Sequence, residues 1–257
     1  MSNDALYVYG VVRFGLDLDW QEEGITGQKV YLISEGNVGA LGHDCEDKAY
    51  NSENPEEIKE MIISHNKILD RAMEDFGGVL PLPFNTIIRG GTNSARANLK
   101  KWLNDDKERL ERIWDKVKGK KEYGLRVYYE KEKLLREAYA HEEVKTIEKS
   151  SAGKGQGLRY LLQGKAESKM REIFQERLNK LKLEFLEGIK KITEDVVNNP
   201  SRISLEEEKD LLLSVSVLME EKEINNLTEF LEKKAGDFPF QMAGPFAPYS
   251  FVENGKQ

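Results

Sequence analysis

The stretch that decides the fold is Tyr123-Gly124-Leu125-Arg126-Val127-Tyr128-Tyr129. It is rich in aromatic and β-branched residues and therefore predicts a β-strand. A charged and partly helical segment follows this strand, and then comes a flexible, glycine-rich loop over Ser150–Gly157. A helical pattern of apolar residues starts at Leu158 and continues to about Val197.

Further toward the C-terminus, the pattern predicts two strands, a helix and a last strand. These are Ser201–Leu205, Leu211–Met219, Glu223–Lys234 and Phe238–Met242. The order strand, helix, strand, strand, helix, strand is that of the ferredoxin-like, or split βαβ, fold. We therefore expect this fold over residues 120–243.

The helix predicted from Leu158 is unusually long. At 1.5 Å per residue it would measure roughly 60 Å, which exceeds the size of a small domain. We expect it either to break, at Gly164 or Gly188, or to project and meet another protein. Its apolar stripe is wide enough to pack within the chain or against a partner helix.

The N-terminal half predicts a separate α+β unit. Strands are expected at Leu6–Val12, Lys29–Ser34 and Val38–Leu41, and Asn54 is expected to cap a helix that ends at Gly77. The fold class is thus α+β with two domains and long helices. The domains are an N-terminal α+β domain over residues 1–91, a linking helix over 92–119, and a ferredoxin-like C-terminal domain over 120–257 that includes an extended tail.

The tail is Gly244-Pro245-Phe246-Ala247-Pro248-Tyr249-Ser250-Phe251-Val252. Apolar rings are costly in water, so a tail this rich in aromatics should be docked, either on its own domain or on a partner protein. A second rigid apolar segment combines prolines with a ring, and its role is either edge packing or partner contact. The candidate protein-interaction residues from the two segments are Pro81, Pro83, Phe84, Pro245, Phe246, Pro248, Tyr249 and Phe251.

The composition excludes several classes of function. Among 257 residues, 39% are hydrophobic and 33% charged, and the net charge of −7 argues against nonspecific binding to nucleic acid. No apolar run is long enough to span a membrane, and the first residues do not resemble a secretory signal. The single cysteine, Cys45, rules out an internal disulfide and is typical of the cytoplasm.

No convincing catalytic constellation is present. His43-Asp44-Cys45 lacks further ligands at metal-binding spacing, so His43 is expected at a surface strand end. His65 lies on an apolar helical stripe and is expected to be a core or interface histidine bonded to a backbone carbonyl rather than a general base. The loop Gly153–Gly157 lacks the spacing of known phosphate-binding motifs. We therefore predict no catalytic residue, no cofactor and no metal.

A series of short blocks, in order, resembles the gas vesicle GvpL/GvpF family. The tail matches its Gly-Pro-aromatic-x-Pro-Tyr-x-Phe ending. The other matching blocks are Leu6–Val12, Gly24–Val30, Asn37–Leu41, His65 with Val79–Thr86, Glu122–Val127 and Gly155–Leu162. Phe246, Ala247 and Tyr123 depart from the family pattern, where Trp, Pro and Trp are expected, but an aromatic ring is kept at two of these positions.

The resemblance implies a cytoplasmic, non-enzymatic accessory or minor structural protein of gas vesicle assembly. Its partners would be the gas vesicle shell protein and other gas vesicle accessory proteins, and self-association is also possible. Neither nucleic acid nor a membrane is expected as a partner. The alternative is a ferredoxin-like small-ligand regulator or enzyme, which a pocket with convergent polar groups would favour. An RNA-binding role, suggested by Tyr123, Tyr128 and Tyr129, conflicts with the acidic charge balance.

Overall fold

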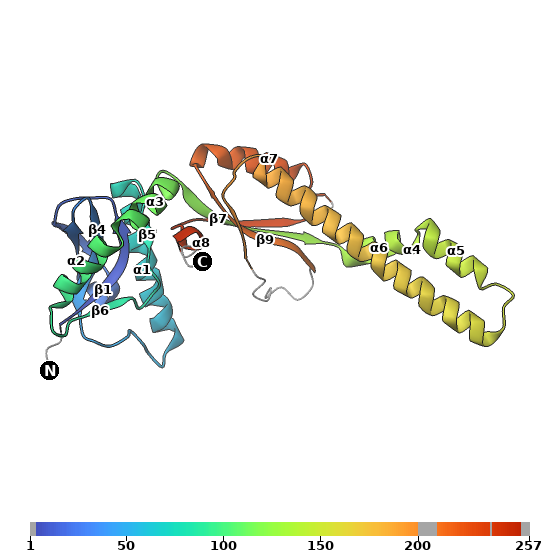
Figure 1. Ribbon diagram of the computed structural model, residues 1–257, viewed down its shortest axis with the longest axis horizontal. Helices are drawn as coiled ribbons and strands as arrows, with labels where there is room; N and C mark the ends of the chain where they lie inside the picture. The colour runs from blue at the N-terminus through green and yellow to red at the C-terminus, as the bar shows by residue number, and fades with distance from the viewer. Residues whose placement is uncertain (1–3, 200–209, 237, 253–257) are drawn as a thin grey trace. The chain divides into compact units, whose positions relative to one another are not determined.

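A computed structural model of the chain describes residues 4–199, 210–236 and 238–252 (Figure 1). The chain divides into two compact units. Unit 1 comprises Met1–Tyr123, Leu218–Glu221 and Gly244–Gln257, and unit 2 comprises Gly124–Val217 and Lys222–Ala243. The tail thus belongs to unit 1, although it follows unit 2 in sequence, and residues 92–119 are also part of unit 1.

Unit 1 contains a sheet with the strand order β2-β3-β4-β1-β5, in which β6 also pairs with β1. Its strands are β1 (Ala5–Val12), β2 (Leu18–Glu23), β3 (Lys29–Glu35), β4 (Val38–Cys45), β5 (Leu80–Pro81) and β6 (Ile87–Arg89). Every residue of β1 is buried, which makes this strand the centre of the core. The two predicted strands β3 and β4 are present and pair with each other as an antiparallel hairpin. Strand β2 was not predicted, because an exposed edge strand rich in acids has no apolar face to reveal it.

Helices of unit 1 pack beside this sheet. They are α1 (Pro55–Phe76), α2 (Ala95–Asp105), α3 (Lys107–Val117) and α8 (Tyr249–Val252), with the short 3₁₀ turn η1 (Ile25–Gly27). Asn54 caps α1 by accepting from the backbone N–H of Glu56, and Gly77 ends it at a φ of 74°, as predicted.

The single helix expected over residues 92–119 is wrong. The chain forms α2 and α3 instead, and Asp106 separates them with a φ of −102° and a ψ of 4°. The Asp106 carboxylate accepts hydrogen bonds from the Arg109 guanidinium. Aspartate is unfavourable in a helix interior, which favours a boundary at this position, although the Asp106 side chain accepts no capping hydrogen bond from the backbone of α3.

Unit 2 is built around a sheet with the strand order β10-β7-β9-β8. Its strands are β7 (Lys121–Tyr129), β8 (Val196–Asn198), β9 (Asp210–Met219) and β10 (Phe240–Phe246). Its helices are α4 (Lys131–Tyr139), α5 (Glu142–Ser150), α6 (Gln156–Lys190) and α7 (Ile224–Glu232). The short 3₁₀ turn η2 (Glu221–Glu223) precedes α7. Pro245 lies on β10 at the edge of the sheet, where a missing N–H is tolerated. The predicted strand Ser201–Leu205 lies outside the described residues.

Helix α6 is continuous and does not break at either glycine. It ends at Lys190 rather than near Val197, because Val196–Asn198 pair with β9 as strand β8. Gly188 is explained by packing, since a Cβ atom there would overlap the ring of Phe230 on α7. The ring of Phe185 on α6 also contacts Phe230 and Phe238.

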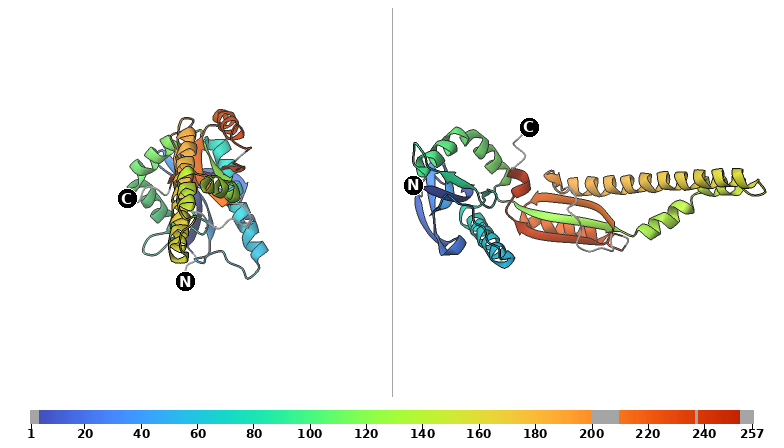
Figure 2. Two further views of the ribbon diagram at one scale, coloured as in Figure 1. Left: turned by 90° about the vertical axis from the view of Figure 1, so that its right-hand side faces the viewer. Right: turned by 90° about the horizontal axis from the view of Figure 1, so that it is seen from below.

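The N-terminal half of α6 lies along α4 and α5 and forms a helical hairpin with them (Figure 2). Val144 of α5 and Ala166 and Met170 of α6 are buried in this hairpin. The turn between α5 and α6 and the first turns of α6, residues 151–161, form its end, which we call the hairpin end. Part of the long apolar stripe is therefore covered by the chain's own helices.

Candidate functional site

The C-terminal tail is held in unit 1 by a buried carboxylate. Glu122, at the start of β7, is 7% exposed. Its two oxygens accept hydrogen bonds from the backbone N–H of Ser250, at 2.9 Å, and from the Ser250 hydroxyl, at 2.6 Å. Ala247, Pro248 and Phe251 are buried beside these bonds. Residues Tyr249–Val252 form the short helix α8, so the tail is not extended throughout, as its prolines had suggested.

A chain of hydrogen bonds connects the tail to the core strand β1. The Tyr249 hydroxyl lies 3.0 Å from Nε2 of His65, and Nδ1 of His65 lies 2.8 Å from the Tyr7 hydroxyl. The Tyr249 hydroxyl also donates to Oδ1 of Asn66, at 3.3 Å. His65 is thus a core histidine, as expected, but its ring nitrogens face tyrosine hydroxyls.

A second histidine lies beside the first. His43 was expected at a surface strand end, which is wrong: it is 1% exposed. Its Nδ1 lies 3.0 Å from the Tyr9 hydroxyl and its Nε2 lies 2.8 Å from the Tyr50 hydroxyl. The ring of His43 stacks on that of Tyr7, with centroids 5.1 Å apart. Strand β4 is buried from Val38 to His43, and its exposed end begins only at Asp44.

Burial controls the protonation of this cluster. Loss of hydration lowers the pKa of His43 and the pKa of His65 to about 4 each, and it raises the pKa of Tyr7, Tyr9 and Tyr249. Both imidazoles are therefore neutral at pH 7, and the phenols are protonated. A general base works best with a pKa near the operating pH, so this arrangement suits structure and docking better than proton transfer.

The structure separates the candidate interaction residues into two groups. Pro81, Pro248 and Phe251 are buried, and Tyr249 and Phe84 are half-buried. Pro83, Pro245 and Phe246 are exposed, and the ring of Phe246 is 47% exposed. The first group anchors the tail and β5 in unit 1, while the second remains available at the surface.

The partners of these residues carry no motif that sets them apart in the sequence. Glu122, Tyr7 and Tyr9 were noted only as parts of strands, and Tyr50 was not noted. No local signal set Glu122 apart, because Lys121 and Arg126 are charged residues of the same strand. The exposed apolar residues at the start of α6 were also missed, because their spacing resembles a continuation of the buried stripe.

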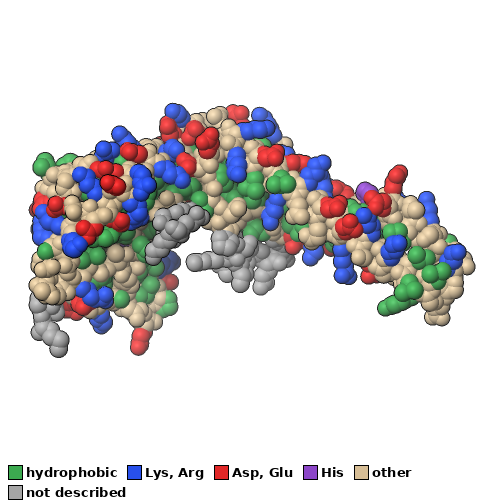
Figure 3. Space-filling view, viewed as in Figure 1, with side chains coloured by type: hydrophobic (Ala, Val, Ile, Leu, Met, Phe, Trp, Pro, Cys, Tyr) green, Lys and Arg blue, Asp and Glu red, His purple; other side chains and the backbone are tan. Residues whose placement is uncertain are grey.

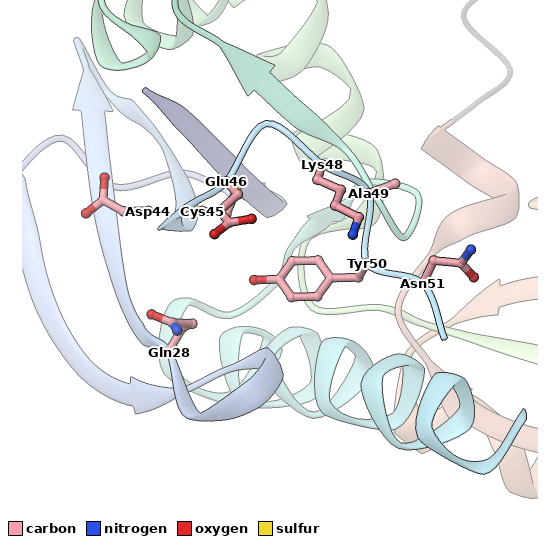
Figure 4. A pocket seen from close by; sticks show the side chains of 8 residues that line it. All are labelled: Gln28, Asp44, Cys45, Glu46, Lys48, Ala49, Tyr50 and Asn51. Atoms are coloured by element: carbon pink, nitrogen blue, oxygen red, sulfur yellow. The ribbon is translucent and has the colours of Figure 1, made fainter. Parts of the chain in front are cut away.

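A pocket of about 490 Å³ opens beside Tyr50, the residue whose hydroxyl bonds to His43 (Figure 4). It is lined by Gln28, Asp44, Cys45, Glu46, Lys48, Ala49, Tyr50 and Asn51. Burial raises the pKa of the Cys45 thiol, which keeps it protonated and a poor nucleophile. Among the described residues, no group of three or more His, Cys, Asp or Glu side chains could hold a metal ion. The same part of the chain contains no helix with the length and apolar character needed to cross a bilayer.

The bond between Glu122 and Ser250 can be tested by an isosteric change. We expect Glu122→Gln to lower the free energy of unfolding by about 1 kcal/mol, because the two charge-assisted hydrogen bonds from Ser250 become weaker neutral ones: the amide oxygen accepts from the backbone N–H and the amide NH2 donates to the hydroxyl oxygen. Urea denaturation followed by circular dichroism measures this change. Glu60→Gln, at an exposed position on α1, is the control and should leave the midpoint unchanged. Equal midpoints for both variants would contradict the role of Glu122.

The geometry therefore defines a mixed α/β protein whose C-terminal tail completes its first unit. The chain belongs to the family described as "Gas vesicle synthesis protein GvpL/GvpF", which matches residues 5–253. It is 27% identical over 247 residues to gas vesicle protein L of Haloferax mediterranei, covering 91% of this chain and 74% of that protein. It is 25% identical over 239 residues to gas vesicle protein L1 of Halobacterium salinarum, covering 89% and 83%.

Two crystal structures share the fold. The gas vesicle protein GvpF from Anabaena sp. PCC7120 superposes with a TM-score of 0.76 at 18% identity, covering 97% of this chain and 98% of that one. GvpF from Microcystis aeruginosa gives a TM-score of 0.68 at 16% identity, covering 97% and 99%. The mixed α/β architecture is therefore that of the GvpF structures.

Proposed function

We propose that this protein is a non-enzymatic accessory or minor structural protein of gas vesicle assembly. It binds shell subunits and other vesicle proteins during nucleation or growth of the gas-filled shell, in the cytoplasm and at the vesicle. Family membership over residues 5–253 supports the role in assembly. The neutral buried histidines and the protonated Cys45 thiol support a function without catalysis.

We infer that unit 2 is a ferredoxin-like domain. Numbered in chain order, its four strands take the spatial order 4-1-3-2, and helices follow the first and third of them. This supports the split βαβ topology predicted from the sequence. Such folds host many functions, so the domain type does not itself identify the partner.

The proposed contact surface rests on one observation: part of the tail is buried and part of it is exposed. Ala247, Pro248 and Phe251 are buried anchors, whereas Pro245 and Phe246 are exposed. An aromatic ring held at the surface by a rigid, anchored segment loses little conformational entropy when it binds. We therefore place the contact with apolar shell subunits at Phe246 and Pro245. Covering apolar surface on the subunits would keep them from aggregating before they are added to the shell.

The test uses a host that carries a complete vesicle gene cluster from which this chain has been deleted. The wild-type chain, Phe246→Ser and Tyr139→Ser are each restored, and pressure-collapsible vesicles are counted by microscopy. Tyr139 on α4 is the matched control, because it is 48% exposed against 47% for Phe246. We expect Phe246→Ser to lower the vesicle count at least about tenfold, the effect of losing one interface hot spot.

Each strain also needs a measurement of protein level and a thermal melt of the purified variant. The proposal requires Phe246→Ser to fold like the wild type and still fail to restore vesicles. Vesicles that form normally without the chain would contradict the role in assembly. Full restoration by Phe246→Ser would contradict only the placement of the contact on the tail.

A further inference from the structure

The hairpin end of unit 2 carries apolar side chains that nothing in the described chain covers. Leu158, Tyr160 and Leu161, in the first turns of α6, are 48%, 78% and 67% exposed. Figure 3 shows hydrophobic side chains gathered over this end. Large apolar residues scattered singly are ordinary on a surface, but three within four residues form a patch that marks an interaction site.

The charges on the hairpin end itself are of one sign, and acidic residues resume on either side at Glu148 and Glu167. From Lys149 to Ala166 the chain holds four basic residues, Lys149, Lys154, Arg159 and Lys165, and no acidic one. None of the four forms an ion pair in the part of the chain that the structure describes. Lys165 shares a groove with Glu142 and Glu143, which leaves the other three as the cations nearest the turn.

The rest of the chain has the opposite balance. Unit 1 contains 25 acidic and 18 basic residues, which gives a formal charge of −7, whereas unit 2 contains 21 of each. The basic hairpin end is therefore attracted to unit 1 of another copy of the chain. Contact between two hairpin ends would instead bring like charges together, which is unfavourable.

Unit 1 offers a complementary surface along its edge strand β2. From Phe14 to Gln28 the chain holds four acidic residues and no basic one. Leu16 and Leu18, at the start of this stretch, are 70% and 38% exposed. Arg96 pairs with Asp17 and Arg71 pairs with Glu22, but Arg71 also serves two carboxylates of α1. Asp19 and Glu23 are exposed, and of these only Glu23 has a cation, Lys29, opposite it on β3.

We propose that the protein associates with itself head to tail, with the hairpin end of one copy docking on the β2 edge of unit 1 of the next. Leu158, Tyr160 and Leu161 cover Leu16 and Leu18, while Lys154 and Arg159 face Asp19 and Glu23. The two surfaces differ, so the contact is heterologous and leaves one of each free on every pair. Further copies then add to form short chains or a ring. A patch of this size gives a weak contact that dissociates readily.

Sedimentation velocity of the purified full chain tests this proposal without any vesicle component, so its failure is separate from failure of the proposed function. The weight-average sedimentation coefficient should rise between roughly 1 and 300 µM protein, the range of a small interface. Raising the salt from about 0.05 M to about 0.5 M should weaken the association, because exposed charges are screened.

Charge reversal identifies the two surfaces. Lys154→Glu with Arg159→Glu removes the docking end, and Asp19→Lys with Glu23→Lys removes the acceptor. Each double variant alone should associate with an apparent Kd at least about tenfold weaker than that of the wild type, so that it is mainly monomeric at concentrations where the wild type associates. An equimolar mixture of the two should recover association, because the unchanged docking end of one variant meets the unchanged acceptor of the other, and the two reversed surfaces again carry opposite charges.

Two controls keep the test sharp. Lys180→Glu with Lys182→Glu reverses two exposed charges on α6 away from the hairpin end and should associate like the wild type. Leu161→Ser should weaken association, while Leu183→Ser, at a site 58% exposed on the same helix, should not. A wild-type chain that stays monomeric throughout overturns the proposal. A mixture of the two double variants that stays monomeric also overturns it. The same holds if the hairpin end binds anionic lipid vesicles while the chain shows no self-association.

Discussion

Replacing Phe251 by alanine is expected to lower the free energy of unfolding of unit 1 by about 3–5 kcal/mol. Phe251 is 4% exposed, and its helix α8 packs against α3 and β5 within unit 1. The Lys116 ammonium lies 5.4 Å from the centre of its ring, so the substitution removes a cation–π contact together with the buried area. The cavity left by a lost ring explains the upper part of the expected range.

The same tail supplies a matched control. Phe246→Ala deletes an identical side chain five residues earlier, but its ring is 47% exposed, so the free energy of unfolding should change by less than about 0.5 kcal/mol. Urea denaturation followed by tryptophan fluorescence measures both variants. Trp114 is buried on α3, the helix that α8 contacts, and so reports on this region. Equal losses of stability for the two variants would show that the tail is not docked through Phe251.

Docking of the tail changes how a truncation should be interpreted. Removing the chain from Gly244 onward would delete three buried residues of unit 1 together with the exposed Phe246. Loss of vesicles in such a strain would therefore mix a folding defect with a binding defect. Point variants at Phe246 and Phe251 separate the two, because one acts at the surface and the other in the core.

Local signals in the sequence predicted much of the secondary structure. Asn54 before Pro55, acids in the first turn and Gly77 at the end placed α1 correctly, because helix caps depend on neighbouring residues alone. The break between α2 and α3 was not predicted, since the apolar pattern continues across Asp106 and only its φ and ψ reveal the boundary. Strand β8 was read as helix because its three residues follow a long helical pattern.

The site was harder to predict because its contacts join distant parts of the chain. His65 and Tyr249 are 184 residues apart, and no spacing rule connects them. The apolar stripe of α1 did place His65 in the core. Adjacent strand residues point to opposite faces, so His43 and Asp44 could not both be buried, but the sequence did not show which one faces the core.

Acidification from pH 6.5 to pH 4 is expected to destabilise unit 1 by about 3 kcal/mol for each of its two buried histidines. Burial lowers the pKa of His43 and the pKa of His65 from 6.5 to about 4. Between these pH values the unfolded chain binds protons that the folded chain does not. Stability is therefore full above pH 6.5 and falls as the pH decreases, by about 1.4 kcal/mol per pH unit for each histidine.

The chain has three histidines, and the third provides the control. His141 is exposed at the N-cap of α5 in unit 2, so His141→Gln should leave the pH dependence of unit 1 unchanged. In His65→Gln, only His43 remains to bind the extra proton, and the slope of unfolding free energy against pH should fall to about half. This slope is read from urea denaturation at several pH values, followed by tryptophan fluorescence, which reports on unit 1 because Trp20, Trp102 and Trp114 all belong to it. It reports titration separately from any constant loss of stability in the variant, and an unchanged slope in His65→Gln would show that His65 is already protonated in the folded chain.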